Sequence, residues 1–358
     1  MFKAYANKRV FLTGHTGFKG AWLGAWLRAL GAETAGFSLV PQTEPSMFKA
    51  VRAEKNFAVS HTGDIRDFDA VRKAVADFRP EIIFHLAAQP IVRRSYRDPA
   101  ETYTTNVIGT LNVLEAARGC PSVRAFVNIT TDKCYENPES GEPFAESNPM
   151  GGHDIYSSSK ACSEILSSSY RKSFLKDGYA LATARAGNVI GGGDWAEDRL
   201  VPDCVRAFVA GERVRIRNPK SVRPWQHALD PLSGYLRLGE LLLSGGAEYA
   251  EAFNFGPEPD SFADVESVAK KFVEKFGRGE ISFGAGDSLH EAKLLTLDIG
   301  KARARLGWTP TLTLDCAVSD TAEWYAAFYG GADMDKFTVR QIAEFEKKSN
   351  GKSTPKHS

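Results

Sequence analysis

Three polar residues that follow a short apolar segment are suited to acid–base chemistry. Residues 125–130 are mostly apolar and β-branched, a composition typical of a buried strand. Thr131, Asp132 and Lys133 come directly after this segment. In a parallel α/β sheet, ligands bind beyond the carboxyl ends of the strands. We therefore expect these three side chains to face a pocket.

A tyrosine and a lysine at helical spacing predict a second contribution to that pocket. Tyr156 and Lys160 are four residues apart in a helical segment that begins at Asp154, so both side chains point from one face of the helix. A free phenol has a pKa near ~10, and a neighbouring cation favours its deprotonated form, which can act as a base. A surface Tyr–Lys pair is the alternative. The position of the pair after a dinucleotide-binding pattern favours a functional role.

A glycine-rich loop near the start of the chain predicts a dinucleotide site. A strand is expected over residues 9–13, and a helix from about 18 to 30. Glycines in a G-x-x-G-x-x-G spacing permit a tight turn, close approach to a pyrophosphate and close packing of the helix on the strand. The helix N-terminus supplies amide groups to the phosphates. The expected cofactor contacts in this loop are Gly14, Thr16, Gly17, Phe18, Lys19 and Gly20.

Positions farther along the chain complete this predicted site. The second strand, expected over 33–38, ends at Ser38, where many NAD enzymes carry an acidic residue, so this position does not decide between NAD and NADP. Asp64 could bind the adenine amino group or cap the next helix. His85, inside the apolar strand 81–86, is expected to be a hydrogen-bonded core residue. The other expected cofactor contacts are Ile65, Leu86, Ala87, Ala88, Gln89, Asn106 and Thr130, together with Tyr156 and Lys160.

The order of the expected elements predicts the fold class. Strands and helices alternate regularly in the first half, which is typical of an α/β protein with a doubly wound parallel sheet (Rossmann-type). Shorter elements follow, which predict a smaller, mainly C-terminal α/β substrate domain. The expected parts are a dinucleotide-binding domain over 1–187 with returning segments near 228–250 and 290–300, a substrate domain over 188–330, and a C-terminal helix and tail over 331–358.

Arginines gather in the expected substrate domain. The planar guanidinium group forms paired, charge-assisted hydrogen bonds with a diphosphate. We therefore interpret this region as a site for a diphosphate-bearing substrate, with a solvated basic loop as the alternative. The expected substrate contacts are Asn188, Asp194, Trp195, Arg199, Arg215, Arg217, Arg223 and His290.

The composition argues against several classes of protein. The chain has 358 residues and a formal net charge of +1, so its overall charge does not favour nucleic acid or an anionic membrane as a partner. Its five cysteines include no C-x-x-C pair, which favours reduced thiols in the cytoplasm over disulfides or a zinc site. The chain has no run of ~18 apolar residues. We expect a cytoplasmic protein that spans no membrane and binds no metal.

In their order, these motifs resemble the extended short-chain dehydrogenase/reductase superfamily, over about residues 7–330. The matching features are T-G-x-x-G-F-x-G at 13–20, L-A-A-Q at 86–89, Asn106, and Tyr156 with Lys160. Within the superfamily, the chain is most similar to the branch that dehydrates CDP-glucose. The segments behind this narrower resemblance are 14–20, 130–135, 191–195, 223–227 and 290–292.

The resemblance implies tightly held NAD and conversion of CDP-glucose to CDP-4-dehydro-6-deoxyglucose, a step of deoxysugar biosynthesis. Tyr156 would take the proton of the glucose 4-hydroxyl, Thr131 would hydrogen-bond the same oxygen, and Lys160 would hold the cofactor ribose. Asp132 would protonate the 6-hydroxyl as water leaves. Lys133 stands where the related dTDP-glucose enzymes carry Glu, so it either removes the C5 proton or stabilises the enolate while another group takes that proton.

Two other functions remain open at this point. The first is a related sugar-nucleotide enzyme, either an epimerase or a dehydratase of the dTDP-glucose or GDP-mannose type. An epimerase has no need of the acid at Asp132. The second is a non-catalytic dinucleotide sensor, which has no reason to retain Thr131, Tyr156 and Lys160 together. The resemblance also implies a homodimer formed through two long helices, expected near 97–118 and 154–173.

Overall fold

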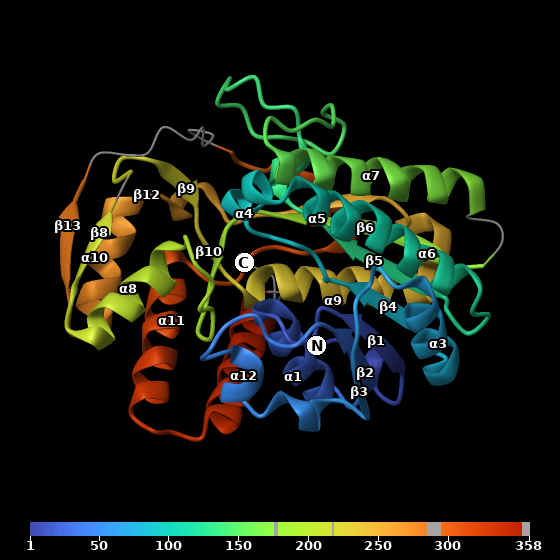
Figure 1. Cartoon of the computed structure of the whole chain (residues 1–358), viewed down its shortest axis with the longest axis horizontal. Coiled ribbons are helices and arrows are strands. Elements are labelled where there is room, and N and C mark those ends of the chain that lie inside the picture. The colour runs from blue at the N-terminus through green and yellow to red at the C-terminus, as the bar shows by residue number, and fades with distance from the viewer. Residues whose placement is uncertain (175–177, 217, 285–294, 353–358) are drawn as a thin grey trace, which may run out of the picture.

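The computed structural model describes residues 1–174, 178–216, 218–284 and 295–352 (Figure 1). Two of the predicted substrate contacts, Arg217 and His290, lie outside these residues.

Seven parallel strands form the large sheet, in the order β11-β6-β5-β4-β1-β2-β3. The order reverses between β1 and β4, where the chain crosses from one half of the sheet to the other, and ligands bind at such a point in doubly wound sheets. The predicted fold class is therefore confirmed. The strands are β1 (Arg9–Thr13), β2 (Glu33–Ser38), β3 (Val59–Thr62), β4 (Ile82–His85), β5 (Ala125–Ile129), β6 (Ala180–Ala186) and β11 (Ala252–Phe255).

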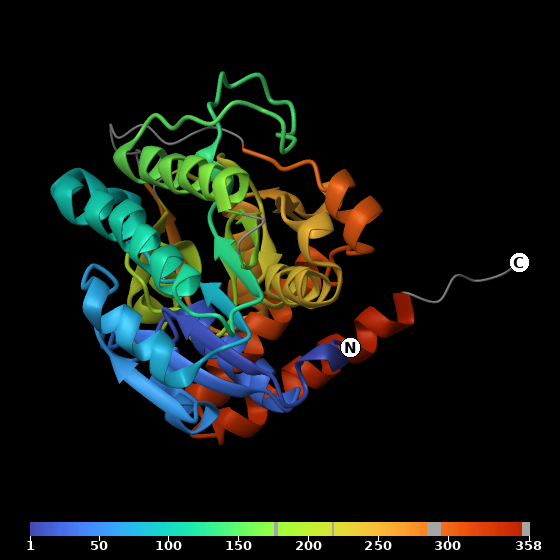
Figure 2. The same ribbon diagram turned by 90° about the vertical axis from the view of Figure 1, so that its right-hand side faces the viewer.

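Helices bury both faces of this sheet, as Figure 2 shows. On one face, Phe11 joins a core with Val71 and Val113 of α3 and α6; on the other, Leu12 packs into a core with Trp22 and Leu232 of α1 and α9. Neighbouring residues of β1 thus point into different cores, as strand geometry requires. The helices concerned are α1 (Phe18–Ala29), α3 (Phe68–Phe78), α6 (Thr110–Arg118), α7 (Ile155–Phe174) and α9 (Leu229–Gly245).

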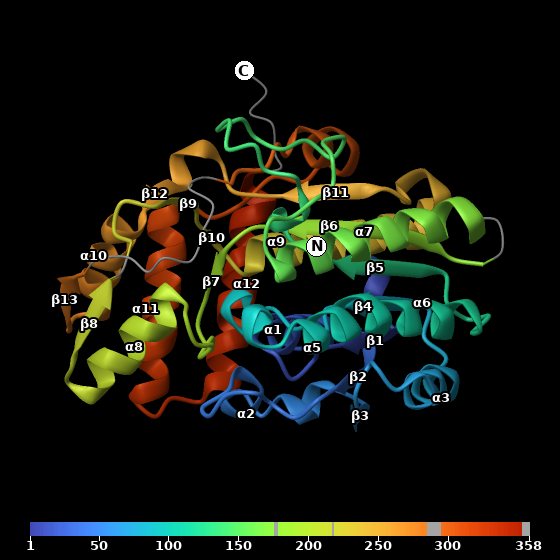
Figure 3. The same cartoon turned by 45° about the horizontal axis from the view of Figure 1, so that its top comes forward.

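The single long helix expected over 97–118 is interrupted. Instead, α4 (Val92–Arg97) and α5 (Pro99–Tyr103) are followed by a π-helical turn over Thr104–Gly109 and then by α6. At Gly109 an added Cβ would lie 2.5 Å from Ile65 Cδ1, so a side chain there would have to displace Ile65. Such π-helical turns often occur at functional sites. This one carries Asn106 into the buried space beside α7, which lies alongside these helices in Figure 3.

A second group of elements lies on the left of Figure 1 and contains three two-stranded sheets. The chain returns from this group to the large sheet with α9, which lies within the segment expected near 228–250, and β11 then joins the edge of the sheet. The exact domain boundaries stay a prediction. The pairs are β7 (Val189–Ile190) with β10 (Gln226–His227), β8 (Arg213–Ile216) with β13 (Glu280–Phe283), and β9 (Val222–Pro224) with β12 (Phe262–Asp264). The remaining α-helices are α2 (Met47–Ala50), α8 (Leu200–Ala210), α10 (Val265–Phe276), α11 (Leu314–Tyr329) and α12 (Met334–Lys352).

Three further findings concern the cysteines, possible metal sites and the lengths of the helices. All five cysteines are free thiols. Among the described residues, no group of three or more His, Cys, Asp or Glu side chains is placed to hold a metal ion. Within the same residues, no helix combines the length and the apolar character needed to cross a membrane.

Candidate active site

The turn after β5 presents three polar side chains at the carboxyl edge of the sheet. Asp132 is 3% exposed, and its Oδ1 accepts a hydrogen bond of 2.9 Å from the Thr131 hydroxyl. The Lys133 ammonium lies 3.9 Å from the same oxygen, and its side chain is 30% exposed. An added Cβ at Gly187, after β6, would lie 2.9 Å from Asp132 Oδ2, so a glycine there makes room for the carboxyl group.

Helix α7 brings Tyr156 and Lys160 to this turn. The Asp154 carboxylate accepts a hydrogen bond of 2.9 Å from Ser157 N and so caps the start of the helix. Both side chains are buried, and Lys160 Nζ donates 3.3 Å to the carbonyl oxygen of Ile129, the last residue of β5. The expected convergence of the loop and the helix is therefore present.

The pKa of Tyr156 differs from the expectation. Burial raises the pKa of Tyr156 to about 12, although the hydroxyl of Thr131 and the cation of Arg199 lower it. The expectation that a cation brings this pKa toward neutrality is therefore wrong for the chain alone, because burial outweighs the charges around the phenol. Burial also lowers the pKa of Lys160, to about 8, while the Glu164 carboxylate raises it.

Lys19 and Tyr235 enter the same space. Lys19 Nζ lies 3.4 Å from the Tyr235 hydroxyl. Burial lowers the pKa of Lys19 to about 7, and the cations of Lys160 and Arg199 lower it further, against the effect of Asp132. Burial raises the pKa of Tyr235, and the neighbouring Tyr156 and Asp132 add to that rise. The first turn of α1 and helix α9 thus contribute polar groups to the cluster around Asp132.

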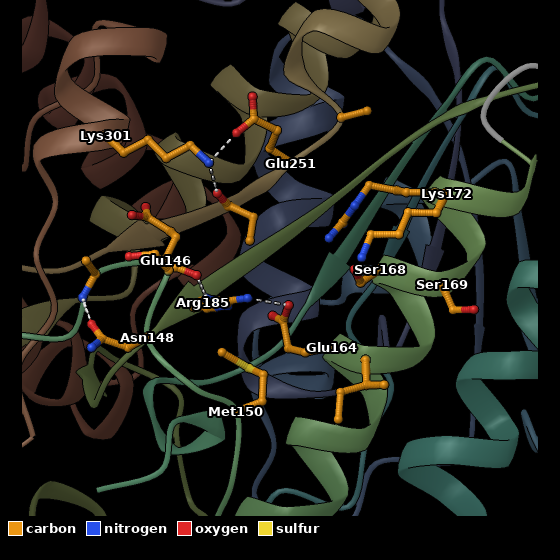
Figure 4. A pocket seen from close by; sticks show the side chains of 16 residues that line it. Glu146, Asn148, Met150, Glu164, Ser168, Ser169, Lys172, Arg185, Glu251 and Lys301 are labelled. Atoms are coloured by element: carbon orange, nitrogen blue, oxygen red, sulfur yellow. Dashed lines mark hydrogen bonds and ion pairs between the residues drawn. The ribbon is translucent and has the colours of Figure 1, made fainter. Parts of the chain in front are cut away.

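A buried ion pair supports the floor of this cluster. Glu164, one helical turn after Lys160, accepts 2.8 Å hydrogen bonds from Thr183 Oγ1 and Arg185 Nη2, and also accepts from the Thr130 hydroxyl. Burial raises the pKa of Glu164, but Arg185 and the two hydroxyl groups outweigh it, so the pKa is lowered. The carboxylate therefore ties α7 to β5 and β6 close to the turn of Thr131, Asp132 and Lys133. Figure 4 shows the ion pair between Glu164 and Arg185.

The glycine-rich loop fits the pyrophosphate of a dinucleotide. Gly14 has a φ of 75°, and an added Cβ there would lie 2.7 Å from Ala87 N. At Gly20 an added Cβ would lie 2.1 Å from Gly14 O, so the loop and α1 pack without room for side chains. Gly17 precedes α1 without a side-chain cap in the described structure, which leaves the amide groups at the helix start available to an anion.

Other predicted cofactor contacts form hydrogen bonds or lie at strand ends. The Thr16 hydroxyl lies 2.9 Å from Ser38 Oγ and donates 2.8 Å to Leu39 O. Asn106 exchanges hydrogen bonds with the backbone of Gln89, at 2.8 and 3.1 Å, and donates 2.9 Å to Ser159 Oγ. Leu86, Ala87 and Ala88 are half-buried where β4 ends. Ile65, which follows β3, is buried, and Phe18, at the start of α1, is half-buried.

The structure bears on the roles predicted for Asp64 and His85. Asp64 pairs with Arg66 and accepts 2.9 Å from its backbone N, whereas the cap of α3 is Asp67, which accepts 3.1 Å from Ala70 N. The capping role for Asp64 is therefore wrong, and its contact with adenine stays a prediction. His85 is a hydrogen-bonded core residue, as expected, with the Thr13 hydroxyl at 2.7 Å.

The predicted substrate residues occupy different environments. Arg199 donates 2.7 Å to Asp194, and its charge acts on Tyr156, so both residues belong to the cluster around Asp132. Trp195 is 4% exposed and packs edge-on against rings of α11. Three others lie in the second group of elements: Asn188, half-buried before β7; Arg215, exposed on β8; and Arg223, half-buried on β9.

Residues 10–256 match the model of the NAD dependent epimerase/dehydratase family. The chain belongs to this family. A relative in it, the CDP-glucose 4,6-dehydratase of Salmonella typhimurium (strain LT2), is 46% identical over 95% of this chain and 97% of its own length. A dTDP-glucose 4,6-dehydratase of Xanthomonas campestris pv. campestris is 26% identical over 74% of this chain and 77% of its own. The Thermus thermophilus UDP-glucose 4-epimerase complex with NAD is 25% identical, with a TM-score of 0.75 over 90% of this chain and 100% of that one.

Three residues close to the turn of Thr131, Asp132 and Lys133 were not predicted. Glu164 follows Lys160 by four residues, so the spacing rule that paired Tyr156 with Lys160 would have found it. Tyr235 lies in an apolar helix and looks like an ordinary core residue, so no local signal marks it. No sequence pattern marks Gly187, because its role depends on the nearness of Asp132 in the fold.

Proposed function

We propose that this chain is a CDP-glucose 4,6-dehydratase, a hydro-lyase that converts CDP-glucose to CDP-4-dehydro-6-deoxyglucose and water. The observation that carries this proposal is the 46% identity to such an enzyme over nearly the whole chain. The arrangement of Asp132 beside Thr131, Tyr156 and Lys160 supplies the acid and base groups that the reaction needs.

We propose NAD as the cofactor, held by the loop of residues 14–20, by Ser38 and by Lys160. When bound, this cofactor supplies reversible hydride transfer, out of C4 of the glucose and back to C6. The chain supplies the amide groups at the start of α1 for the pyrophosphate and a buried, cationic Lys160 for the ribose.

For the oxidation, Tyr156 takes the proton of the glucose 4-hydroxyl and Thr131 hydrogen-bonds the same oxygen. The two hydroxyl groups interact in the structure, so both can reach one substrate oxygen. The high pKa of the buried phenol means that the chain alone keeps Tyr156 protonated. The Thr131 hydroxyl and the Arg199 cation act against burial and favour removal of the phenol proton.

For the elimination, Asp132 donates a proton to the 6-hydroxyl, because hydroxide is a poor leaving group. Its carboxyl group is buried, and the Thr131 hydroxyl orients it. Lys133, 3.9 Å away, either removes the C5 proton or stabilises the enolate. If Lys133 stabilises the enolate, another group takes the C5 proton. In both cases Asp132 supplies the proton that reaches the departing water. Arg199 and the arginines of β8 and β9 are proposed to bind the diphosphate.

Purified protein is expected to convert CDP-glucose to a product lighter by one water. With deuterium at C4 of the substrate, the label is expected at C6 of the product, because the hydride returns within the same active site. Mass spectrometry and NMR of the product test both points. Parallel reactions with dTDP-glucose, GDP-mannose and UDP-glucose are the controls. A product of unchanged mass, or loss of the label to added NAD, would contradict the proposal.

We further propose a cytoplasmic homodimer that pairs through α5, the π-helical turn, α6 and α7. The free cysteines fit a reducing compartment. Ile108, on the turn, is 46% exposed, which leaves an apolar side chain for a partner to cover. Ile108→Asp is expected to convert the dimer to a monomer in light scattering after gel filtration. An unchanged mass for this variant would place the dimer contact elsewhere.

A further inference from the structure

An ion pair connects the part of the chain that contains the large sheet with the second group of elements. Arg93 lies in the first turn of α4, and Asp198 lies between β7 and α8. In Figure 1, α4 lies on the side of the row of helices α4 to α6 that faces this second group. Arg93 Nε lies 3.5 Å from Asp198 Oδ1, and the two side chains are 27% and 28% exposed.

The start of α4 is held against α7, the helix that carries the predicted base. The Gln89 side chain accepts 2.7 Å from Ile91 N and donates 3.1 Å to Ile91 O. The backbone of Gln89 exchanges hydrogen bonds with Asn106, which in turn donates 2.9 Å to Ser159 of α7. Gln89 and Asn106 are both buried, so water does not compete for these bonds. Arg93 therefore extends from a backbone segment whose position relative to α7 is fixed.

The backbone turns sharply at Asp198. Its φ is 59°, in the left-handed region, which few residues other than glycine adopt and in which aspartate is enriched. The side chains diverge at this turn: Asp198 contacts Arg93, whereas Arg199 donates 2.7 Å to Asp194. The ion pair therefore anchors the residue directly before Arg199.

Other contacts of the segment 194–199 lead away from α7. The carbonyl oxygen of Asp194 accepts a hydrogen bond from the Tyr325 hydroxyl on α11, and that of Trp195 accepts 2.8 Å from Arg206 Nη1 on α8. These bonds hold the segment to the second group of elements but do not set its distance from α7. The ion pair with Arg93 does so, through α4.

We propose that Arg93 and Asp198 are positioning residues, whose ion pair holds the segment 194–199, and with it Arg199, in place relative to α7. The Arg199 cation acts on Tyr156, and the energy between charges falls with distance, so this action depends on where the segment lies. The consequence for the reaction rests on the proposed function. A partly exposed ion pair contributes little to overall stability, so its loss is expected to loosen this segment without unfolding the chain.

Hydrogen exchange of the full chain, followed by mass spectrometry, tests the proposal without substrate. In Arg93→Gln the amides of 194–199 are expected to exchange about two- to fivefold faster, the size expected for one partly exposed ion pair. The substitution lies outside this peptide, so the intrinsic exchange rates there do not change. Asp198→Asn keeps a residue type that tolerates the left-handed backbone. In that variant, adding Arg93→Gln is expected to have no further effect, because the partner charge is already absent.

Arg94→Gln is the matched control. Arg94 is the next residue of α4 and pairs at 2.6 Å with Glu101 of α5, within the same part of the chain. Its exchange at 194–199 is expected to equal that of wild type. The proposal is overturned if Arg93→Gln exchanges there as Arg94→Gln does, or if Arg93→Gln has its full effect in the Asp198→Asn variant as well. Faster exchange across the whole chain would also overturn it, because that result reports a loss of global stability.

Kinetics with CDP-glucose test the consequence for the reaction. Arg93→Gln is expected to raise KM about two- to fivefold, because fewer molecules hold Arg199 ready for the diphosphate. At saturation the substrate itself holds Arg199, so kcat is expected to stay within about twofold of wild type. An unchanged KM beside faster exchange would overturn the role in the reaction. If wild type does not convert CDP-glucose, the proposed function fails, while the exchange experiment still decides whether the ion pair holds the segment.

Discussion

Replacing Tyr156 by phenylalanine is expected to lower kcat by about 10²- to 10⁴-fold, the usual contribution of one general base. The change removes only the hydroxyl group, which interacts with Thr131 at the end of β5. Without this base the glucose is not oxidised at C4, so C5 does not become acidic. In D₂O, neither product nor deuterium at C5 of the recovered substrate is expected.

Asp132→Asn is expected to fail at a later step with a loss of similar size. The amide keeps the shape of the carboxyl group and can still lie beside Thr131, but it does not donate a proton to a leaving hydroxide. Oxidation at C4 and proton removal at C5 continue, so the recovered substrate is expected to gain deuterium at C5 while no product forms. NMR of the recovered CDP-glucose distinguishes the two variants.

Tyr170→Phe is the matched control for this pair of variants. Tyr170 lies on the same helix as Tyr156, but its hydroxyl donates 2.6 Å to Glu115, away from the catalytic turn. Its kcat is expected to stay close to that of wild type. If both active-site variants stop before any exchange at C5, the separate roles given to Tyr156 and Asp132 are wrong.

Glu164→Gln is expected to lower the free energy of unfolding by about 3–5 kcal/mol at neutral pH, because it leaves the Arg185 cation buried without its counter-charge. The side chains of this pair are 1% and 5% exposed, so water does not replace the lost partner. Loss of the carboxylate also removes the charge that raises the pKa of Lys160. The midpoint of urea denaturation, followed by circular dichroism, measures the change.

The pH dependence of this effect has a definite sign. Since the folded-state pKa of Glu164 is lowered, its ionised form stabilises the fold above the unfolded pKa of about 4.3, and this stability is lost as pH falls through the folded value. The difference between wild type and Glu164→Gln is therefore expected to be largest near neutral pH and to shrink below about pH 4.

Glu115→Gln is the control, because Glu115 forms a surface pair with Arg118 on α6. It is expected to change stability by less than about 1 kcal/mol. Equal losses of stability for Glu164→Gln and Glu115→Gln would show that the buried pair contributes no more to the free energy of unfolding than the surface pair.

Local patterns in the sequence predicted much of the fold and part of the site. The strand at 9–13, the glycine-rich loop and the helix from Phe18 lie where they were predicted. Short runs of apolar residues and glycines largely set the backbone conformation of their own segment. Tyr156 and Lys160 also share a helix, as their spacing required. The parallel pairing of the strands agrees with the predicted alternation of strands and helices.

Contacts between distant segments decided the rest. Gly109 on the π-helical turn approaches Ile65, which is remote in the sequence, and the cap of α3 is Asp67 and not Asp64. The position of Tyr235 beside Asp132 comes from helix α9, which is far away in the chain.

The residue types and their spacing thus determined the fold class, the dinucleotide loop and the identity of the acid and base candidates. Only the tertiary structure decided how strongly those groups hold their protons. Burial of Tyr156 raises its pKa against the expected effect of a nearby cation, and Glu164 reaches Arg185 and Thr130 across three separate elements. The physical reason is that desolvation and charge pairing depend on everything packed around a group, and most of those neighbours are remote in the sequence.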